Sequence, residues 1–410
     1  MKTKRLIVVL GVLALSLTLF AQEIAHDEIV VMIKVPVRVF DGDRFVDDLT
    51  IDDFEVYENG ELQEIAACYM IKKTQVERKE EIKARLDPDI SRTFVLLFDI
   101  WEFFPKVEMA IDGFFENVVL KGDSLIIVTP VKAYHMKENV WNYLEKKKIA
   151  EQLKRIVRED TLMGNAEYRN TLRELEEITK EINSLIGIQS AMNAYDPTSG
   201  EDPIDYLDYR IQKYRQALFR VRNLRAVDEQ NMINFAKLAK DQSGQKIAFL
   251  FCQREIVPQP SPKVLSILES EFQFQRPDIP AKLNELFSDS SRNISIDTRD
   301  VKRAFSDSSV LVHFLYITKP VEPAQEIQYR EQSEDIYKTF SDIAEATGGL
   351  SESSANPEAT LQKAVVASEN YYLLYYRASN YKRDGEYKNI KVKVTAGSYR
   401  VTHRSGYIAN

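Results

Sequence analysis

Cysteine, glycine and proline are scarce in this chain of 410 residues, which contains only 2 Cys, 14 Gly and 14 Pro. Two cysteines cannot form the framework of a disulfide-rich secreted domain, and so few Gly and Pro exclude a collagen-like or low-complexity chain. The formal net charge is -8, and no Lys/Arg-rich stretch is free of interleaved acids, so the basic footprint of a nucleic-acid-binding protein is missing. With 44% apolar residues the chain can bury a core, and we expect two or three globular domains.

Motifs that carry a catalytic mechanism are absent as well. The sequence has no G-x-S-x-G elbow, no G-x-x-x-x-G-K phosphate loop, no H-E-x-x-H and no C-x-x-C. Its 4 His are scattered, and His313 lies inside an apolar run, where a core or sheet-edge histidine is expected rather than a catalyst. We therefore expect a protein that is not an enzyme and takes no small-molecule substrate. An exported hydrolase remains a distant alternative.

The longest apolar run is at the N-terminus. Three basic residues among the first five precede apolar residues 6–20, which are short for a membrane span and end in the small residue Ala21. This pattern predicts a secretory signal peptide over residues 1–21, with an uncleaved membrane anchor as the alternative. No later run is long enough to span a membrane. We expect an exported protein, periplasmic or extracellular in a Gram-negative-type bacterium, without stable membrane insertion after cleavage.

Export would permit a disulfide, and Cys68 and Cys252 are its only candidates. Both lie in apolar, strand-like runs, where a buried free thiol is the more common state. The sequence leaves the pairing of these two residues open.

Residues 22–71 have the pattern of β-strands. Apolar side chains alternate from residue 35 to 39, and Asn59-Gly60 separates two strand-like segments. That dipeptide tolerates the positive φ angles of a type I′ hairpin. A polar, charged segment at 72–91 follows, and we expect it to be a linker.

The C-terminal segment, residues 379–410, returns to a β pattern. Residues 391–395 and 399–403 resemble strands joined by a turn. A two-stranded hairpin needs further strands or a packed face to be stable. We therefore expect the N- and C-terminal segments to pair in one small β-sandwich-like domain.

Between the two ends, the apolar runs are continuous rather than alternating. Continuous runs are typical of strands covered on both faces, and helical patterns separate them here. The runs are residues 94–98, 124–128, 247–251 and 310–316, and the clearest helical patterns are 106–119 and 336–347. Residues 92–378 thus predict an α/β domain with a Rossmann-like, doubly wound, mostly parallel sheet.

A helical insertion is expected at about residues 140–240, because far more chain lies there than one crossover helix requires. A stripe with 4-3-4-3-4 spacing runs through Leu207, Ile211, Tyr214, Leu218, Val221 and Arg225, with Leu224 as the apolar fit beside the last. A comparable stripe at 172–185 predicts an antiparallel helical hairpin. The stripes indicate either a partner-binding surface or a hairpin that packs only on itself, and periodicity does not separate the two.

Four segments resemble one bacterial family. They are LTIDDFEVYENG at 49–60, AEATGG at 344–349, YYLLYY at 371–376 and RSGY at 404–407. They are similar to exported proteins with a von Willebrand factor type A related domain, over most of the mature chain except the helical insertion. The resemblance implies a Rossmann-like type A domain and a role in binding or assembly, with no enzymatic activity established for the family at large.

Type A domains commonly hold Mg²⁺ through a D-x-S-x-S strand end, a Thr from a later loop and an Asp after another strand. Asp99 matches the leading Asp, but Trp101 and Phe103 stand where the two Ser should be. The later strand continues into residues 252–255, Cys-Gln-Arg-Glu, instead of an Asp-Gly step. Within that segment, Arg254 could place a positive charge near the site. The metal site implied by the resemblance is therefore degenerate.

Asp99 and Glu102 alone offer too few oxygens for a protein-held Mg²⁺. We expect no metal and no cofactor, and we expect Asp99 to pair with a nearby Arg or to cap a helix terminus. The alternative is a divalent-cation-dependent adhesion module, in which Asp99, Glu102 and carboxylates from elsewhere rebuild a Mg²⁺ site.

Aromatic residues follow Asp99 at the edge where open α/β folds place their ligands. They act either as a plug over the vacated metal site, the preferred reading for Phe103, or as anchors for a protein partner. The overall expectation is a non-enzymatic scaffold that binds another envelope or secreted protein. Its partner-binding candidates are Trp101, Phe104, Leu207, Ile211, Tyr214 and Leu218.

Overall fold

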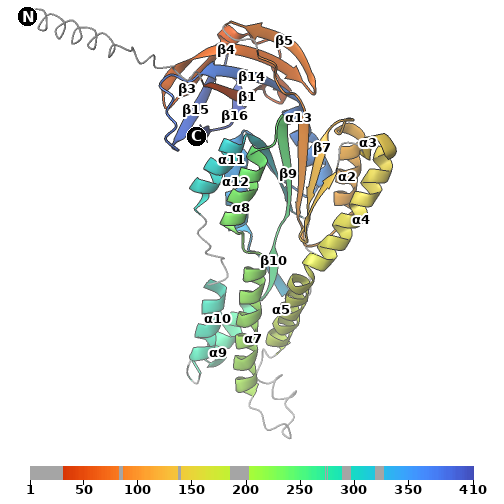
Figure 1. Ribbon diagram of the computed structural model, residues 1–410. Coiled ribbons are helices and arrows are strands. Elements are labelled where there is room, and N and C mark those ends of the chain that lie inside the picture. The colour runs from red at the N-terminus through yellow and green to blue at the C-terminus, as the bar shows by residue number, and fades with distance from the viewer. Residues whose placement is uncertain are drawn as a thin grey trace, which may run out of the picture.

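The computed structural model describes residues 31–82, 86–136, 140–184, 203–272, 274, 276–288, 297–318 and 327–410. The predicted signal peptide at 1–21 lies outside the described residues. The described chain forms three tiers (Figure 1): an antiparallel sheet at one end, an α/β body in the middle and a helical projection at the other end. No helix in the described ranges is both long enough and apolar enough to cross a membrane.

The α/β body is built on a six-stranded, mostly parallel sheet with the strand order β13–β11–β9–β6–β7–β8. Its edge strand β8 runs antiparallel to β7, and the other described pairs are parallel. The strands are β6 (Arg92–Asp99), β7 (Ser124–Val128), β8 (Ala133–Met136), β9 (Gln245–Gln253), β11 (Val310–Ile317) and β13 (Ser351–Ser354). The four continuous apolar runs form β6, β7, β9 and β11, which confirms the predicted mostly parallel sheet.

Helices cover both faces of this sheet, which explains why its four inner strands, β11, β9, β6 and β7, are continuous apolar runs. Phe94, Leu96 and Phe98 of β6 pack on one face, against α2 (Pro105–Asn117), α4 (Lys146–Gly164) and α13 (Pro357–Glu369). The short helix α3 (Val140–Tyr143) adds Trp141 to the same core. On the other face Val95 packs with α8 (Glu229–Lys240), α11 (Thr298–Ser308) and α12 (Glu334–Thr347).

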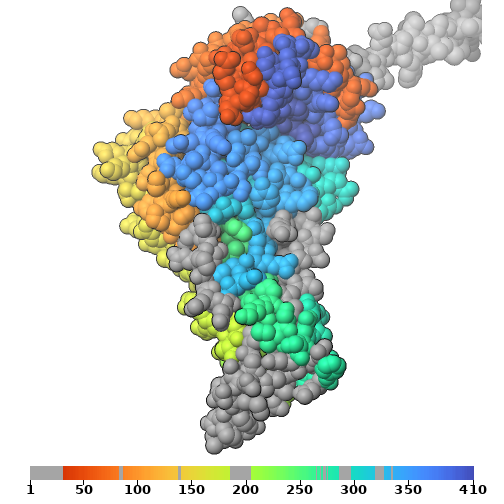
Figure 2. Space-filling view, turned by 180° about the vertical axis from the view of Figure 1, so that it is seen from behind, coloured from red at the N-terminus to blue at the C-terminus, as the bar shows by residue number. Residues whose placement is uncertain are grey.

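The antiparallel sheet joins the two ends of the described chain. Its main strand order is β16–β1–β14–β4–β3–β15–β17, with β2 beside β1 and β5 beside β4. The strands are β1 (Met32–Asp41), β2 (Arg44–Phe45), β3 (Phe54–Glu58), β4 (Glu61–Lys72), β5 (Gln75–Glu81), β14 (Asn370–Arg377), β15 (Tyr387–Val394), β16 (Arg400–His403) and β17 (Gly406–Ile408). Figure 2 shows the early and late parts of the chain side by side at this end of the molecule. The predicted pairing of the terminal segments is therefore present.

The turn between β3 and β4 follows the sequence prediction. Asn59 and Gly60 have positive φ angles of 49° and 90°, as both central residues of a type I′ turn require.

A short 3₁₀ helix, η1 (Ile51–Asp53), precedes β3, and a capping box between Thr50 and Asp53 caps its first turn.

Three features of this sheet differ from expectation. Residues 371–376 belong to β14, which lies between β1 and β4 in the antiparallel sheet rather than in the α/β domain predicted over 92–378. Part of the predicted linker at 72–91 forms β5, an edge strand paired with β4. Strands β15 and β16 were expected to form a hairpin, but β15 pairs with β3 and β17 whereas β16 pairs with β1.

The projection contains more chain than the predicted hairpin. Helices α5 (Ala166–Ser184) and α7 (Pro203–Leu224) pack with α9 (Pro262–Phe272), α10 (Asp278–Ser288) and β10 (Ile256–Pro260), which pairs with β12 (Ile327–Glu331). In contrast, α4 and α8 pack on the sheet of the body, although both fall within the insertion predicted at about 140–240. A pattern of helical periodicity shows where helices form but not which core each one joins.

Candidate functional site

The strand order of the parallel sheet reverses between β6 and β9. Open α/β folds bind ligands in the crevice outside the carboxyl ends of such strands. Asp99 is the last residue of β6, and it lies opposite Cys252 near the end of β9. The sequence-predicted Asp99 thus stands at the topological switch point.

Arg225 fills this position from a distant part of the chain. It follows α7 directly, and its Nη1 lies 2.8 Å from Asp99 Oδ1 while its Nε lies 2.8 Å from Glu255 Oε1. The side chains of Arg225 and Glu255 are 7% and 2% exposed, so this ion pair is buried. We call Asp99, Arg225, Cys252 and Glu255 the switch-point cluster.

Electrostatics keep Arg225 charged. Burial by itself lowers the pKa of the Arg225 guanidinium, but the adjacent carboxylates of Asp99 and Glu255 outweigh it and the pKa is raised. Of the two roles expected for Asp99, pairing with an arginine or capping a helix terminus, the structure has the first. The arginine is Arg225 rather than Arg254, whose Nε lies 2.8 Å from Glu331 Oε2.

Arg225 was missed as a site residue although its position in the sequence carried a signal. The 4-3-4-3-4 spacing from Leu207 continues the buried stripe of α7 to an arginine just after the helix, and a buried arginine needs carboxylate partners. The apolar fit favoured Leu224 instead, but Leu224 is 39% exposed.

Cys252 completes the cluster without offering a nucleophile. Its Sγ lies 3.5 Å from Asp99 Oδ2. Burial first, and then the negative charge of Asp99, raise the pKa of this thiol well above its ordinary value, so the thiolate is disfavoured. Cys68 lies in the antiparallel sheet, and both cysteines are buried free thiols.

Trp101 and Phe104 are held in place rather than presented as free anchors. The Trp101 indole Nε1 donates a hydrogen bond of 3.1 Å to the Arg254 carbonyl, and the ring lies 6.0 Å from Tyr168 of the projection. Phe104 is 8% exposed and packs in the core beneath α2. Trp101 therefore joins the body to the projection.

Glu102 and Phe103 lie on the same loop. The backbone N–H groups of Trp101 and Glu102 both donate to Gln253 Oε1, at 3.2 and 3.0 Å. Phe103 is partly buried, with the guanidinium of Arg158 5.0 Å from its ring centre. Gln253 thus fixes the backbone of the loop that follows Asp99.

The partner-binding candidates on α7 are core residues in the structure. Leu207, Ile211, Tyr214 and Leu218 are each 1–2% exposed. The Tyr214 hydroxyl also donates a hydrogen bond of 2.7 Å to the carbonyl of Pro258 in β10. These four side chains bind α7 to its neighbours and do not reach the surface, which corrects their assignment as contact residues.

A cavity of about 400 Å³ lies next to the switch-point cluster, between the sheet and helices α8 and α12. Most of its lining is apolar, including Leu97, Leu250 and Phe340. Its two acids already have partners, because Asp99 pairs with Arg225 and Asp228 accepts a hydrogen bond from the Asn231 N–H at the start of α8. The lining therefore lacks a free general base among the residues that the structure describes.

Within the described ranges, no group of three or more His, Cys, Asp or Glu side chains is arranged to hold a metal ion. Comparisons of this chain with protein-family models, curated proteins and solved structures found no match.

Proposed function

We propose that this protein is an exported, non-enzymatic scaffold that binds another envelope or secreted protein, built on a von Willebrand factor type A-like domain with a degenerate metal site. The strand order supports the type A-like assignment. Numbered along the chain, the strands of the body follow the order 3-2-1-4-5-6, which is the doubly wound order, with an antiparallel third strand at the edge.

The observation that carries the functional proposal is the position of Arg225. A type A domain that grips its partner through Mg²⁺ needs carboxylate and hydroxyl oxygens that converge on an open cation site. Here a buried guanidinium neutralises Asp99 and Glu255 at that edge. Partner binding at this edge would therefore have to proceed without a metal, or binding would have to use another surface.

The projection is the surface we favour. It stands at the end of the molecule opposite the antiparallel sheet (Figure 1). Its inner stripe is buried, but Tyr209 and Phe219 of α7 are 50% and 63% exposed, and large aromatic side chains of this kind contribute strongly to protein interfaces. We propose that these outward-facing residues, rather than the inner stripe, contact the partner.

Deleting residues 165–238 would not test this proposal, because that range includes α8, whose Ala236 lies in the core of the body, and Arg225 of the switch-point cluster. Surface variants avoid the problem. Tyr209→Ser and Phe219→Ser leave the cores of the projection and of the α/β body intact. Leu238→Ser on α8 is a matched control, because Leu238 is 71% exposed on the body.

The experiment captures partners from the native envelope with residues 22–410 as bait, identifies them, and repeats the binding with purified components. We expect binding to persist in EDTA and in Leu238→Ser, and to weaken at least tenfold in the double variant of Tyr209 and Phe219. Binding that EDTA abolishes and Mg²⁺ restores would instead support the adhesion module. Equal binding by all variants would exclude α7 as the contact surface.

A further inference from the structure

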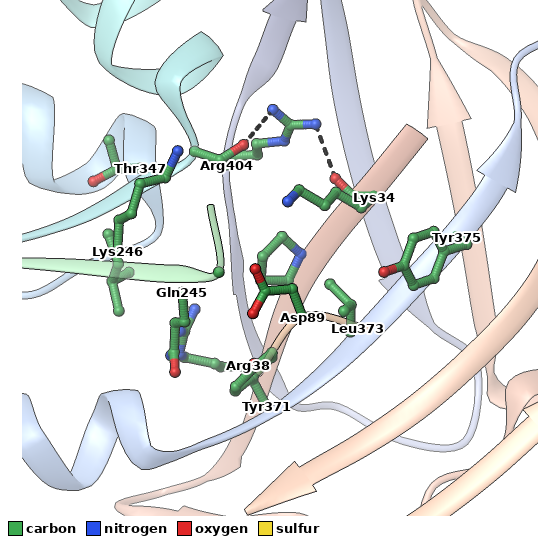
Figure 3. Close-up of a pocket in the computed structure, with 14 residues that line it drawn as sticks. Lys34, Arg38, Asp89, Gln245, Lys246, Thr347, Tyr371, Leu373, Tyr375 and Arg404 are labelled. Carbon is green, nitrogen blue, oxygen red and sulfur yellow. Dashed lines mark hydrogen bonds between the residues drawn. The ribbon is translucent and has the colours of Figure 1, made fainter. Parts of the chain in front are cut away.

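A second polar site lies where the antiparallel sheet meets the α/β body, at the opposite end of the parallel strands from the switch-point cluster. It is a pocket of about 50 Å³. Four basic side chains line it, as Figure 3 shows: Lys34 and Arg38 of β1, Lys246 of β9 and Arg404 from the loop after β16. One acid, Asp89, shares the lining. Both tiers of the structure thus contribute positive charge to one small space.

Arg38 has no acceptor for its guanidinium in the part of the chain that the structure describes. The residue is 3% exposed, and its Nε is buried without a hydrogen-bond partner. Its charge is stabilised by the ring of Tyr371, whose centre lies 5.4 Å from the guanidinium carbon. A buried charge without a paired acceptor is costly, so such groups are normally paired or bound to a ligand.

Arg404 and Lys246 are also buried, and their described hydrogen bonds go to neutral oxygens. Arg404 is 8% exposed and donates to Ser309 Oγ at 2.7 Å and to the Lys34 carbonyl at 2.8 Å. Lys246 is 6% exposed and donates to the Lys240 carbonyl at 3.3 Å. Among the described residues, neither forms an ion pair with a carboxylate within 4 Å.

Besides burial, repulsion among these basic side chains contributes to the lowered pKa of Lys246. Burial, followed by repulsion from Lys34 and Arg404, lowers the pKa of Lys246 to about 8. Burial also lowers the pKa of Arg38 to about 10. Asp89 offsets only part of this charge, and it already accepts hydrogen bonds from the Ser91 hydroxyl at 2.6 Å and the Ser91 N–H at 3.0 Å.

The size of the pocket limits the anion that could complete it. A buried water needs a cavity of roughly 10–15 Å³, so the pocket of about 50 Å³ has room for about three to five waters. One tetrahedral oxyanion occupies a comparable volume. Four cations and one carboxylate leave an excess of three positive charges, which a divalent anion would largely neutralise. Arginine and lysine together suit this ligand, because arginine offers directed pairs of N–H donors and lysine a compact charge.

We infer that this pocket binds one free inorganic oxyanion, phosphate or sulfate, through Lys34, Arg38, Lys246 and Arg404. The anion connects the antiparallel sheet to the α/β body, because its ligands come from β1 and the loop after β16 on one side and from β9 on the other. A ligand that binds only the assembled pocket stabilises the folded chain by mass action.

The test titrates residues 22–410 with sodium phosphate and sodium sulfate at constant ionic strength, by calorimetry and by thermal unfolding. We expect a saturable, single-site rise in the melting temperature of the wild-type chain. Arg38→Met and Lys246→Met should each weaken binding at least tenfold. Lys391→Met, an equal charge change at an exposed position of β15, should bind as the wild type does.

The wild-type titration decides the proposal even where a variant fails to fold. A rise no larger than sodium gluconate gives at the same ionic strength would overturn it, as would an undiminished response in a folded Arg38→Met chain. A stronger response to glycerol 3-phosphate than to inorganic phosphate would overturn the assignment of a free oxyanion. In anion-free buffer, Arg38→Met should be at least as stable as the wild type, because it removes an unpaired buried charge.

Discussion

The hydroxyl of Tyr376 donates a hydrogen bond of 2.5 Å to Oε2 of Glu58, a residue 318 positions earlier in the chain. The hydroxyl of Tyr407 donates to the same oxygen at 3.1 Å. Glu58 is 8% exposed, so two tyrosines from the C-terminal segment satisfy a buried acid of the N-terminal segment.

Tyr376→Phe should therefore destabilise the chain by about 1–3 kcal/mol, because it leaves a buried carboxylate with one fewer donor. Urea denaturation measures the change. Tyr57→Phe is the matched control, since the Tyr57 hydroxyl also donates to a glutamate, Glu55, at 2.8 Å but in a more exposed setting. Equal effects of the two substitutions would contradict the importance of the buried bond.

Ending the chain after Tyr376 should remove the strands that flank β1 and β3, namely β16 and β15. The exposed edges should then cause aggregation, because unpaired strand edges recruit other chains. Size-exclusion chromatography of the truncated chain measures this. Soluble, independent folding of residues 28–70 would show that the N-terminal strands need no partner from the C-terminal segment.

Arg225→Met should cost about 3–5 kcal/mol of folding stability, because the buried carboxylate of Glu255 would lose its ion pair with Arg225. Adding Glu255→Gln should recover part of this loss. The control is Arg220→Met on the same helix, whose ion pair with Glu174 is exposed and should contribute less than about 1 kcal/mol. Similar losses for Arg225→Met and Arg220→Met would mean that the cluster has no special role in stability.

Millimolar Mg²⁺ or Mn²⁺ should leave the melting temperature of the wild-type chain unchanged, because the carboxylate at the switch point is already paired with Arg225. A cation held by the folded chain would raise the melting temperature by mass action. A reproducible rise that Asp99→Ala abolishes would favour the adhesion module.

His313 should make stability fall as the pH decreases from about 6.5 to about 3. The residue is buried, its ring stacks on Phe249 and its Nδ1 accepts a hydrogen bond of 3.2 Å from the Leu350 N–H. Burial lowers the pKa of His313 to about 3 in the folded chain, whereas an unfolded histidine titrates near 6.5. Between these values the unfolded state binds more protons, so stability is lost by up to about 1.4 kcal/mol per pH unit from this group.

Urea denaturation at several pH values tests this slope. His313→Asn should reduce it, because asparagine can accept the Leu350 N–H without titrating. His135→Asn, at an exposed position of β8, should keep the wild-type slope. An unchanged slope in His313→Asn would assign the acid sensitivity to other groups.

The sequence predicted strands that are buried on both faces, but it did not predict which sheet each of them joins. Continuous apolar runs correctly predicted β6, β7, β9 and β11, but β14 has the same pattern for a different reason. Its residues Tyr372 and Leu374 face one core of the antiparallel sheet, whereas Tyr371 and Leu373 face another. Burial on both faces therefore does not distinguish a parallel strand from a central antiparallel one.

Two other features were not predicted, because they depend on contacts between residues far apart in the sequence. Strand β5 is polar except at Val76 and pairs on one side only, so its charges looked like those of a linker. The sequence correctly identified Asp99 as the end of a strand. It could not show that Arg225 reaches Asp99, because only the packing of α7 brings them together.

The central position of β14 has a consequence for how the chain is made. Strands β1 and β4 lie on either side of it, and they are synthesised before nearly the whole α/β body. The edges of β1 and β4 that pair with β14 stay unpaired until β14 has been synthesised. Closing so long a loop is less costly once the intervening body has folded and brought its two ends together. We therefore expect the antiparallel sheet to form last, so that its first strands need protection from aggregation during biosynthesis.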